Sequence, residues 1–259
     1  FNSNVAYRLV FPFLPTISRG LGVTTGTLGT ALAMRDLVEM SSPLLGKAID
    51  KRGTNQAMVV GALGLGMAAA LQGASSGLIL FVFALVLTAI SKNSFDIGSS
   101  AWAGASVPYA HRSRAIGMIE TTWALSFVIG MPIASVLIRA GTWRTPFIVI
   151  SILCVIVGII FNQRLPTNPP ISSLENRSRL SLTAKKVICA MIALGAGHMM
   201  MLVTFATFLE DEHNVSTSGL GFVAVIIGLA ELVGSGGVAL IGDKIGKVVN
   251  LSMRSRPSS

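Results

Sequence analysis

Long apolar runs alternate with short polar loops along the whole chain. Most of these runs approach the roughly 17–25 residues that an apolar helix needs to cross a bilayer. They show no strand-type alternation, and only helices or closed barrels satisfy every backbone hydrogen bond in lipid. The pattern therefore predicts an all-α polytopic membrane protein. Its eight expected spans lie at about residues 4–18, 28–45, 57–74, 78–98, 115–138, 145–163, 187–208 and 219–241.

The composition fits a membrane protein. Hydrophobic residues make up 52% of the chain and charged residues only 12%, whereas a soluble domain carries about twice that charged fraction. The net charge of +9 is spread over short loops, so we expect no nucleic-acid partner. Cys154 and Cys189 lie inside apolar runs, which is typical of small core residues, and neither a disulfide nor a metal site is predicted.

The basic residues divide unequally between the two sets of loops. If the loop at 46–56 is cytoplasmic, fourteen Lys and Arg residues lie in loops on that side and three lie on the other. The positive-inside rule then predicts a cytoplasmic N-terminus and cytoplasmic loops. Residues 164–186 are rich in proline, serine and basic residues. We expect this loop to link a six-helix half at 1–163 to residues 187–259, which hold two spans and a polar tail.

Two charged turns are expected, one after the second span of each half. Glycine permits tight turns and close helix approach, and an aspartate at a helix end can accept hydrogen bonds from basic side chains. The alternative is that both turns are only solvated basic loops. The residues that carry the pattern are Gly46, Asp50, Arg52 and Gly53 in the first turn, and Asp243, Lys244, Gly246 and Lys247 in the second.

Two further motifs lie in the fifth span. Arg112-Ser-Arg114-Ala-Ile-Gly opens it, and Gly130-Met-Pro132-Ile-Ala134 lies within it. With the two charged turns, these motifs resemble the G-x-x-x-D-R-x-G-R, R-G-R-A-x-G and G-P-x-x-G signatures of the major facilitator superfamily, the last being typical of its proton-coupled drug and metabolite antiporters. The resemblance extends from about residue 5 to residue 250.

This resemblance implies a six-helix N-terminal bundle followed by the first two helices of a second bundle. It implies secondary active transport of a small organic solute by alternating access, with proton-coupled export favoured over uptake. Asp50 would then belong to a charge clasp, with Arg112 and Arg114 as candidate partners. We expect no cofactor, a proton gradient as the driving force, a lipid bilayer and a small solute as partners, and a monomer.

Several charged residues lie inside the expected spans, where each costs about 2.5–3.5 kcal/mol on insertion scales. Our hypothesis is that they surround a central cavity in which one carboxylate binds the coupling proton. The alternative is that Arg35–Asp36 and Lys92–Asp96 are structural pairs. Glu39 and Glu231 also precede the two turns by similar lengths, as an internal repeat predicts. The expected cavity residues are Arg8, Arg35, Asp36, Glu39, Asp96, Glu120 and Glu231.

Other classes of protein remain as alternatives. An intramembrane aspartyl protease needs Tyr-Asp and Gly-x-Gly-Asp, whereas this chain has Phe95-Asp96 and Ile241-Gly-Asp243, so we expect no enzyme. The family has twelve spans and this chain has eight, so we expect that it does not transport alone, and a truncated or regulatory protein is the alternative. His198 and the three methionines after it point in different directions on a helix, so packing is favoured over copper binding.

Overall fold

The computed structural model describes residues 1–39, 42, 45–46, 49, 53–108, 112–165 and 182–254. Their regular elements are helical, which confirms the predicted all-α class. In chain order they are α1 (Asn2–Arg8), α2 (Leu14–Leu21), α3 (Thr25–Glu39), α5 (Thr54–Ala74), α6 (Leu78–Ser106), α7 (Arg112–Leu125), the π-helical turn η2 (Ser126–Gly130), α8 (Met131–Ala140), α9 (Thr145–Arg164), α10 (Leu182–His213) and α11 (Thr217–Arg254).

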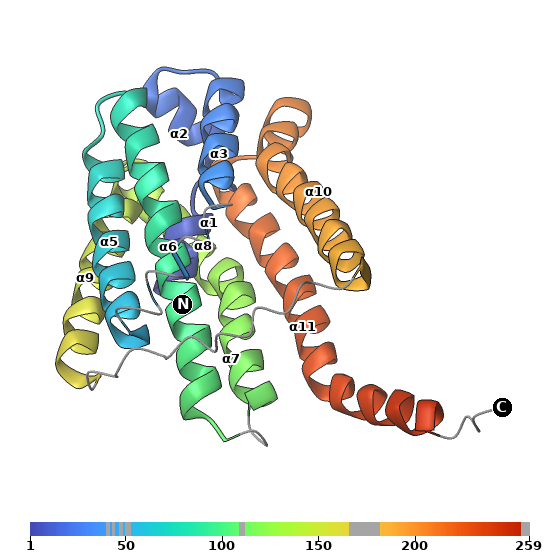
Figure 1. Ribbon diagram of the computed structural model, residues 1–259. Coiled ribbons are helices and arrows are strands. Elements are labelled where there is room, and N and C mark those ends of the chain that lie inside the picture. Colours follow the sequence, from blue (N-terminus) through green and yellow to red (C-terminus); the bar gives the residue numbers. More distant parts are fainter. Residues whose placement is uncertain are drawn as a thin grey trace.

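Six helical stretches within the described residues are long and apolar enough to cross a membrane. They are Thr54–Ala74, Leu78–Ser106, Gly117–Ala140, Thr145–Arg164, Ile188–His213 and Thr217–Gly236. α5 packs on α6 and α9, and α3 packs on α6. α11 runs along α7, η2 and α8, whereas α10 leans on α2 and α3 (Figure 1). The last two helices therefore both dock on the first part of the chain. The predicted linker loop at 164–186 is too long, because residues 182–186 already lie in α10. Residues 166–181 lie outside the described residues, so the rest of the linker stays a prediction.

The first expected span is not one helix. α1 ends at Arg8, a turn follows, and α2 begins at Leu14. Pro12 explains the break, because its ring removes a backbone donor and clashes with the carbonyl four residues earlier. Irregular backbone at membrane depth is tolerated only where protein surrounds it. That condition is met, because the side chains of Leu9, Phe11 and Phe13 are at most 1% exposed.

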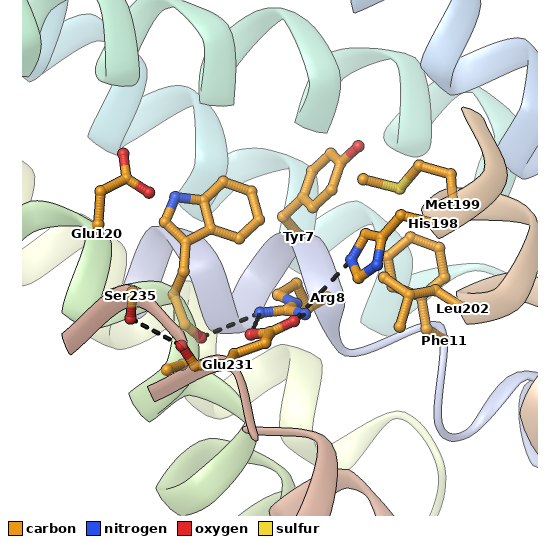
Figure 2. A pocket seen from close by; sticks show the side chains of 11 residues that line it. Tyr7, Arg8, Phe11, Glu120, His198, Met199, Leu202, Glu231 and Ser235 are labelled. Atoms are coloured by element: carbon orange, nitrogen blue, oxygen red, sulfur yellow. Dashed lines mark hydrogen bonds and ion pairs between the residues drawn. The ribbon is translucent and has the colours of Figure 1, made fainter. Parts of the chain in front are cut away.

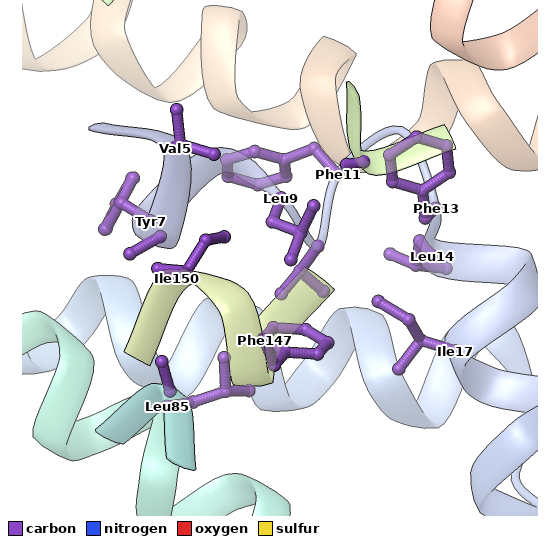
Figure 3. Packing of buried hydrophobic residues seen from close by; sticks show 14 of the residues in the cluster. Val5, Tyr7, Leu9, Phe11, Phe13, Leu14, Ile17, Leu85, Phe147 and Ile150 are labelled. Carbon is purple, nitrogen blue, oxygen red and sulfur yellow. The ribbon is translucent and has the colours of Figure 1, made fainter. Parts of the chain in front are cut away.

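The broken segment runs through the middle of the first bundle, which comprises the helices from α1 to α9. Its side chains Val5, Leu9 and Leu14 meet Leu85 of α6 and Phe147 of α9 in one buried cluster (Figure 3). Between membrane helices, van der Waals packing replaces the hydrophobic effect as the source of association. This packing fixes the end of α1, and therefore Arg8, at the centre of the helix bundle.

The fifth span is interrupted by the π-helical turn η2, and the kink expected at Gly130, Pro132 and Ala134 stays a prediction. Pro132 follows η2 at the start of α8, where the missing backbone donor favours an irregular turn. A Cβ atom on Gly130 would lie 2.6 Å from Val5 Cγ2, so glycine is needed for the close approach of α1. Ala134 is buried on α8.

The second charged turn is not a turn. α11 continues through residues 242–247 and ends at Arg254, so the prediction of a loop and polar tail beginning at residue 242 is wrong as far as Arg254. Residues 237–254 contain no proline, and an interior glycine costs a helix only about 1 kcal/mol. The glycines that suggested a turn are therefore tolerated, and the helix curves near its C-terminal end (Figure 1).

Candidate functional site

A cavity of about 340 Å³ lies between the first bundle and the last two helices. Its walls come from α1 and the turn after it, α7, α10 and α11, so segments from both ends of the chain meet there (Figure 2). Most of the lining is aromatic or aliphatic, and four side chains carry or can carry charge. The lining residues are Tyr7, Arg8, Phe11, Glu120, Trp123, Ala124, His198, Met199, Leu202, Glu231 and Ser235.

An ion pair between Arg8 and Glu231 crosses this cavity. Arg8 Nη1 donates to Glu231 Oε2 at 2.8 Å, and Nη2 donates to Oε1 at 2.5 Å. Paired, charge-assisted bonds of this kind are among the strongest between side chains, because the planar guanidinium matches the carboxylate. The Arg8 side chain is 2% exposed and that of Glu231 is 25% exposed. α1 and α11, 223 residues apart along the chain, are therefore joined inside the protein.

Aromatic rings and a backbone carbonyl hold the guanidinium of Arg8 in place. Its Cζ atom lies 3.6 Å from the ring centroid of Phe127 and 5.4 Å from that of Trp123, within the range of cation–π attraction. Nη1 also donates to the backbone oxygen of Trp123 at 3.1 Å. Arg8 Nε has no hydrogen-bond partner among the described residues. The orientation of Arg8 is thus set mainly by contacts with α7 and η2. Glu231 of α11 then binds the guanidinium.

Two ionisable groups flank the Arg8–Glu231 pair. His198 Nε2 of α10 lies 3.9 Å from Glu231 Oε1, and the histidine is 45% exposed. Glu120 of α7 is exposed, lines the same cavity and lies on the opposite side of the pair from His198 (Figure 2). At 3.9 Å, His198 attracts Glu231 electrostatically only when the imidazole is protonated. α10 and α11 therefore meet at a contact that depends on protonation.

A second charged cluster lies wholly within the first bundle. Arg35 of α3 is fully buried, and its Nε and Nη2 donate to Asp36 Oδ1 at 3.0 and 2.8 Å. Its Nη1 donates to the backbone oxygen of Tyr7 at 3.1 Å, and its Cζ lies 3.9 Å from the Tyr7 ring centroid. The Tyr7 hydroxyl donates to Asp36 at 3.3 Å. Tyr7 therefore separates this cluster from the cavity.

Lys92 and Asp96 form a third pair, one helical turn apart on α6. Lys92 is buried, and its Nζ lies 4.4 Å from the Trp123 ring centroid. The rings of Trp123 and Tyr7 meet edge to face with centroids 6.1 Å apart. Trp123 thus lies between the cation on α6 and the cavity.

The structure brings only part of the predicted set together. Arg8, Glu120 and Glu231 line one cavity, as expected, whereas Arg35–Asp36 and Lys92–Asp96 adopt the alternative arrangement as pairs inside the first bundle. Glu39 and Asp96 are not among the lining residues of this cavity. The roles of all seven residues in binding protons or solute stay predictions.

The gating residues are described only in part. Gly53 has a φ of 92°, in the left-handed region that glycine favours, and its N–H donates to the Ile49 oxygen at 2.8 Å directly before α5 begins. Gly46 is helical. The remaining motif residues cannot be placed in a clasp: Asp50 and Arg52 lie outside the described residues, and only the backbones of Arg112, Arg114, Asp243, Lys244, Gly246 and Lys247 are described.

Sequence reasoning missed the aromatic lining and His198. Trp123 and Phe127 lie within the expected span at 115–138, and nothing in the sequence pattern marks them as partners of Arg8. His198 was assigned to packing because its methionine neighbours point elsewhere. A usable signal was present, because residue 198 lies near the middle of an apolar helix, where an ionisable side chain is by default a candidate for function.

A second set of contacts joins the same helices near the loop between α10 and α11. Arg19, near the end of α2, forms an ion pair with Glu210 of α10. The hydroxyls of Thr16 and Thr217 are 3.4 Å apart, and Ser135 donates to the Thr217 backbone oxygen at 3.4 Å. The first bundle therefore contacts α10 and α11 near the loop that connects these two helices.

Glycine positions along α11 show where its contact with the first bundle ends. A Cβ atom on Gly221 would lie 3.0 Å from Ser135, and one on Gly228 would lie 2.8 Å from Phe127. On Gly234 or Gly236 it would meet no atom within 4 Å among the described residues. α11 is therefore closely packed near its start and separates from the bundle beyond the cavity (Figure 1).

Comparisons with a family profile and with curated proteins both match membrane transport or drug-resistance proteins. The profile of the Major Facilitator Superfamily matches residues 1–255. Multidrug resistance protein MdtG of Salmonella choleraesuis is 26% identical over 269 aligned positions, covering 95% of this chain and 65% of the relative. The chloramphenicol resistance protein of Streptomyces lividans is 25% identical over 231 positions, covering 87% and 58%. Multidrug resistance protein 2 of Bacillus subtilis is 25% identical over 185 positions, covering 69% and 44%. The chain thus spans 44–65% of the length of these relatives.

Proposed function

Because the chain belongs to the major facilitator superfamily of membrane transporters, we propose that it forms the solute-binding part of a secondary active transporter that exchanges protons for a small organic solute by alternating access. The chain is an integral, multi-pass membrane protein. The observation that carries the proposal is the Arg8–Glu231 ion pair, because it joins α1 to α11 across a cavity.

The Arg8–Glu231 pair can couple protonation to the position of α11. While Glu231 is ionised, Arg8 is neutralised and α11 is held against the first bundle. Removing the charge of one partner in a buried pair leaves the other uncompensated, at a cost of about 3–5 kcal/mol. Glu231 is partly exposed, so the cost here lies toward the lower end of that range. A proton on Glu231 would therefore weaken the attachment of α11, and the arrangement of the two halves would respond to protonation.

The asymmetry of the contacts supports alternating access. α11 contacts α2 where Thr217 meets Thr16, and it separates from the first bundle beyond the cavity (Figure 1). If the loops rich in Lys and Arg are cytoplasmic, the closed end faces outward and the cavity faces the cytoplasm. The relatives named for multidrug and chloramphenicol resistance favour export as the direction of transport.

The test uses the natural protein that carries these residues, reconstituted in liposomes with an imposed pH gradient. Tritiated chloramphenicol and a panel of labelled organic solutes are the probes. We expect the gradient to drive at least one solute, and Glu231→Gln to lower that rate by about tenfold or more, equivalent to 1.4 kcal/mol. Glu212→Gln, at the exposed end of α10, is the matched control and should leave the rate unchanged.

Two results would contradict the proposal. Transport that continues at the full rate after the gradient is collapsed, or in Glu231→Gln, would disprove proton coupling through this pair. No movement of any solute above protein-free liposomes would disprove transport by the assayed protein.

A further inference from the structure

A groove of about 420 Å³ lies on the outside of the first bundle, between α5, α6 and the residues that follow α3. It shares no lining residue with the cavity of Arg8 and Glu231. α5 packs on α6 and α9, and it lies on the far side of α6 from α10 and α11 (Figure 1). The groove is therefore separate from the cavity between the first bundle and the last two helices.

The walls of the groove are mostly aliphatic and open to the surroundings. Leu45, Ile49, Ala57, Val60 and Ile90 form them. The side chain of Val60 is 64% exposed and that of Ile90 is 37% exposed. Both belong to helices that are long and apolar enough to cross a membrane, where exposed aliphatic side chains contact lipid tails as readily as they contact each other. An acyl chain can therefore lie along these walls.

Two polar side chains in the groove have no hydrogen bond to another described residue. Gln56, in the first turn of α5, is exposed, whereas Ser94 of α6 is 9% exposed. Gly98 of α6 is opposite Thr54 of α5, so Ser94, one turn earlier on α6, lies about 6 Å deeper in the membrane. A polar group without a partner is costly beside hydrocarbon. The phosphate and ester oxygens of a phospholipid can accept hydrogen bonds at these two depths.

The start of α5 favours a negatively charged headgroup. α5 has no acidic residue in its first turn and no side-chain cap at Gly53, so its own side chains do not neutralise the partial positive charge of the helix terminus. Residues 46–53, directly before α5, contain three basic residues and one aspartate. Basic residues next to a spanning helix attract anionic lipids, which are concentrated in the cytoplasmic leaflet. The predicted orientation places this loop at that leaflet.

We infer that the groove binds one anionic phospholipid. Its acyl chain lies along Val60 and Ile90, an ester oxygen accepts from Ser94, and its phosphate lies beside Gln56 at the start of α5. The lipid contacts α5, α6 and the residues after α3 together, and it leaves the cavity of Arg8 and Glu231 free. Lipid binding and transport are measured separately, so the failure of either proposal leaves the other standing.

The experiment uses the natural protein that carries these residues, purified in detergent, and native mass spectrometry measures the lipid that remains bound. The probes are phosphatidylglycerol, which is anionic, and phosphatidylcholine with the same acyl chains. We expect phosphatidylglycerol to bind at least about fivefold more tightly. Val60→Trp fills the groove and should weaken this binding by about tenfold or more. Met67→Trp, at a 56% exposed position two turns further along the same face of α5, is the control and should leave it unchanged.

A charge substitution tests the position of the headgroup. Gln56→Glu places a negative charge at the start of α5 and should reduce the preference for phosphatidylglycerol to within about twofold, because the phosphate is repelled. Gln163→Glu adds the same charge at an exposed position near the end of α9 and should keep the preference.

A second measurement on the unchanged protein guards against a misfolded variant. Phosphatidylglycerol with a diazirine on its acyl chain is photo-cross-linked, and mass spectrometry locates the labelled peptides. Those that contain Val60 and Ile90 should be labelled. Excess phosphatidylglycerol should prevent this labelling, whereas glycerol phosphate, which has no acyl chain, should not.

Four results would each overturn the inference. They are equal binding of the two lipids, undiminished binding in Val60→Trp, an intact preference in Gln56→Glu, and labelling that avoids both peptides. The last result would also be obtained if another segment of the natural protein covered the groove.

Discussion

The charged pairs within the first bundle and the pair that joins it to α11 are built differently. Arg35 and Asp36 are adjacent in sequence, and Lys92 and Asp96 are one turn apart. Arg8 and Glu231 are 223 residues apart and meet only when α11 is docked. The local pairs are therefore present whenever their helices fold. The long-range pair requires α11 to be docked on the first bundle, and under the proposed alternating access this suits it to act as a switch.

The surroundings of the two kinds of pair strengthen the contrast. Arg35 is fully buried and also donates to a backbone oxygen of α1, so it ties two neighbouring elements of one bundle together. Arg8 is equally buried, and the carboxylates Glu231 and Asp36 are similarly exposed, at 25% and 28%. The two pairs therefore differ in what they join: the Arg8–Glu231 pair joins α1 to α11, and a change there acts between the first bundle and α11.

The largest effect is expected from Arg35→Met, which keeps the side-chain volume but removes the charge. It leaves Asp36 without its cation and the Tyr7 carbonyl without the Arg35 donor, while the Tyr7 hydroxyl still donates to Asp36. The loss should approach the lower end of about 3–5 kcal/mol because Asp36 is partly exposed. Thermal unfolding in detergent, followed by tryptophan fluorescence, measures it. Arg139→Met, at an exposed position of α8, is the control. Equal stability of the two variants would show that the local pair does not support the bundle.

A matched pair of glycine substitutions gives a smaller, more selective effect. A Cβ atom on Gly61 would lie 2.7 Å from the Phe95 nitrogen inside the first bundle, and one on Gly228 would lie 2.8 Å from Phe127 Cβ, between α11 and η2. Overpacking of this kind costs about 1–3 kcal/mol. Gly61→Ala should lower the unfolding temperature. Gly228→Ala should preserve that temperature and instead loosen α11.

Disulfide formation between Thr16→Cys and Thr217→Cys reports that loosening, in a background where Cys154 and Cys189 are serine. The two threonine hydroxyls are 3.4 Å apart, close enough for a bridge after a small adjustment. Cross-linking should be slower in Gly228→Ala and unchanged in Gly61→Ala. The reverse pattern would refute the separation into a stable bundle and a detachable helix.

The smallest effect is expected at the surface pair of Arg19 and Glu210. Arg19 is 60% exposed, and exposed pairs contribute about 1 kcal/mol or less and are screened by salt. Arg19→Gln should therefore change the same cross-linking rate only slightly, and less still in high salt. A loss as large as that in Gly228→Ala would mean that this end is held by charge and not by packing.

The sequence predicted these features to the extent that they are local. Apolar run lengths predicted the helices, whereas the Arg35–Asp36 and Lys92–Asp96 pairs were only the alternative to the predicted cavity, although residues four positions apart on a helix, such as Lys92 and Asp96, are close enough to pair. The break at Pro12 had a clear signal in the proline itself but was missed because the run is apolar throughout. The turn at 242–247 was predicted from glycines and charges that a helix also accepts.

The candidate site was less accessible to sequence reasoning. Arg8 and Glu231 were recognised as costly charges in the membrane, but no spacing rule joins residues so far apart. Which carboxylate is paired and which is not depends on packing between α1, α7 and α11. The contact of His198 with Glu231 likewise requires the position of α10 beside α11, which the sequence alone does not give.

The most direct test of a switch at Arg8–Glu231 is the distance between α7 and α11. Spin labels at Met118 and Val233, both well exposed at 65% and 76%, allow it to be measured by double electron–electron resonance in nanodiscs at pH about 8. We predict that Glu231→Gln lengthens and broadens the distance distribution, while Glu212→Gln matches the unchanged protein. A distribution in Glu231→Gln that overlaps fully with that of the unchanged protein would contradict the claim that this ion pair holds α11 to the first bundle.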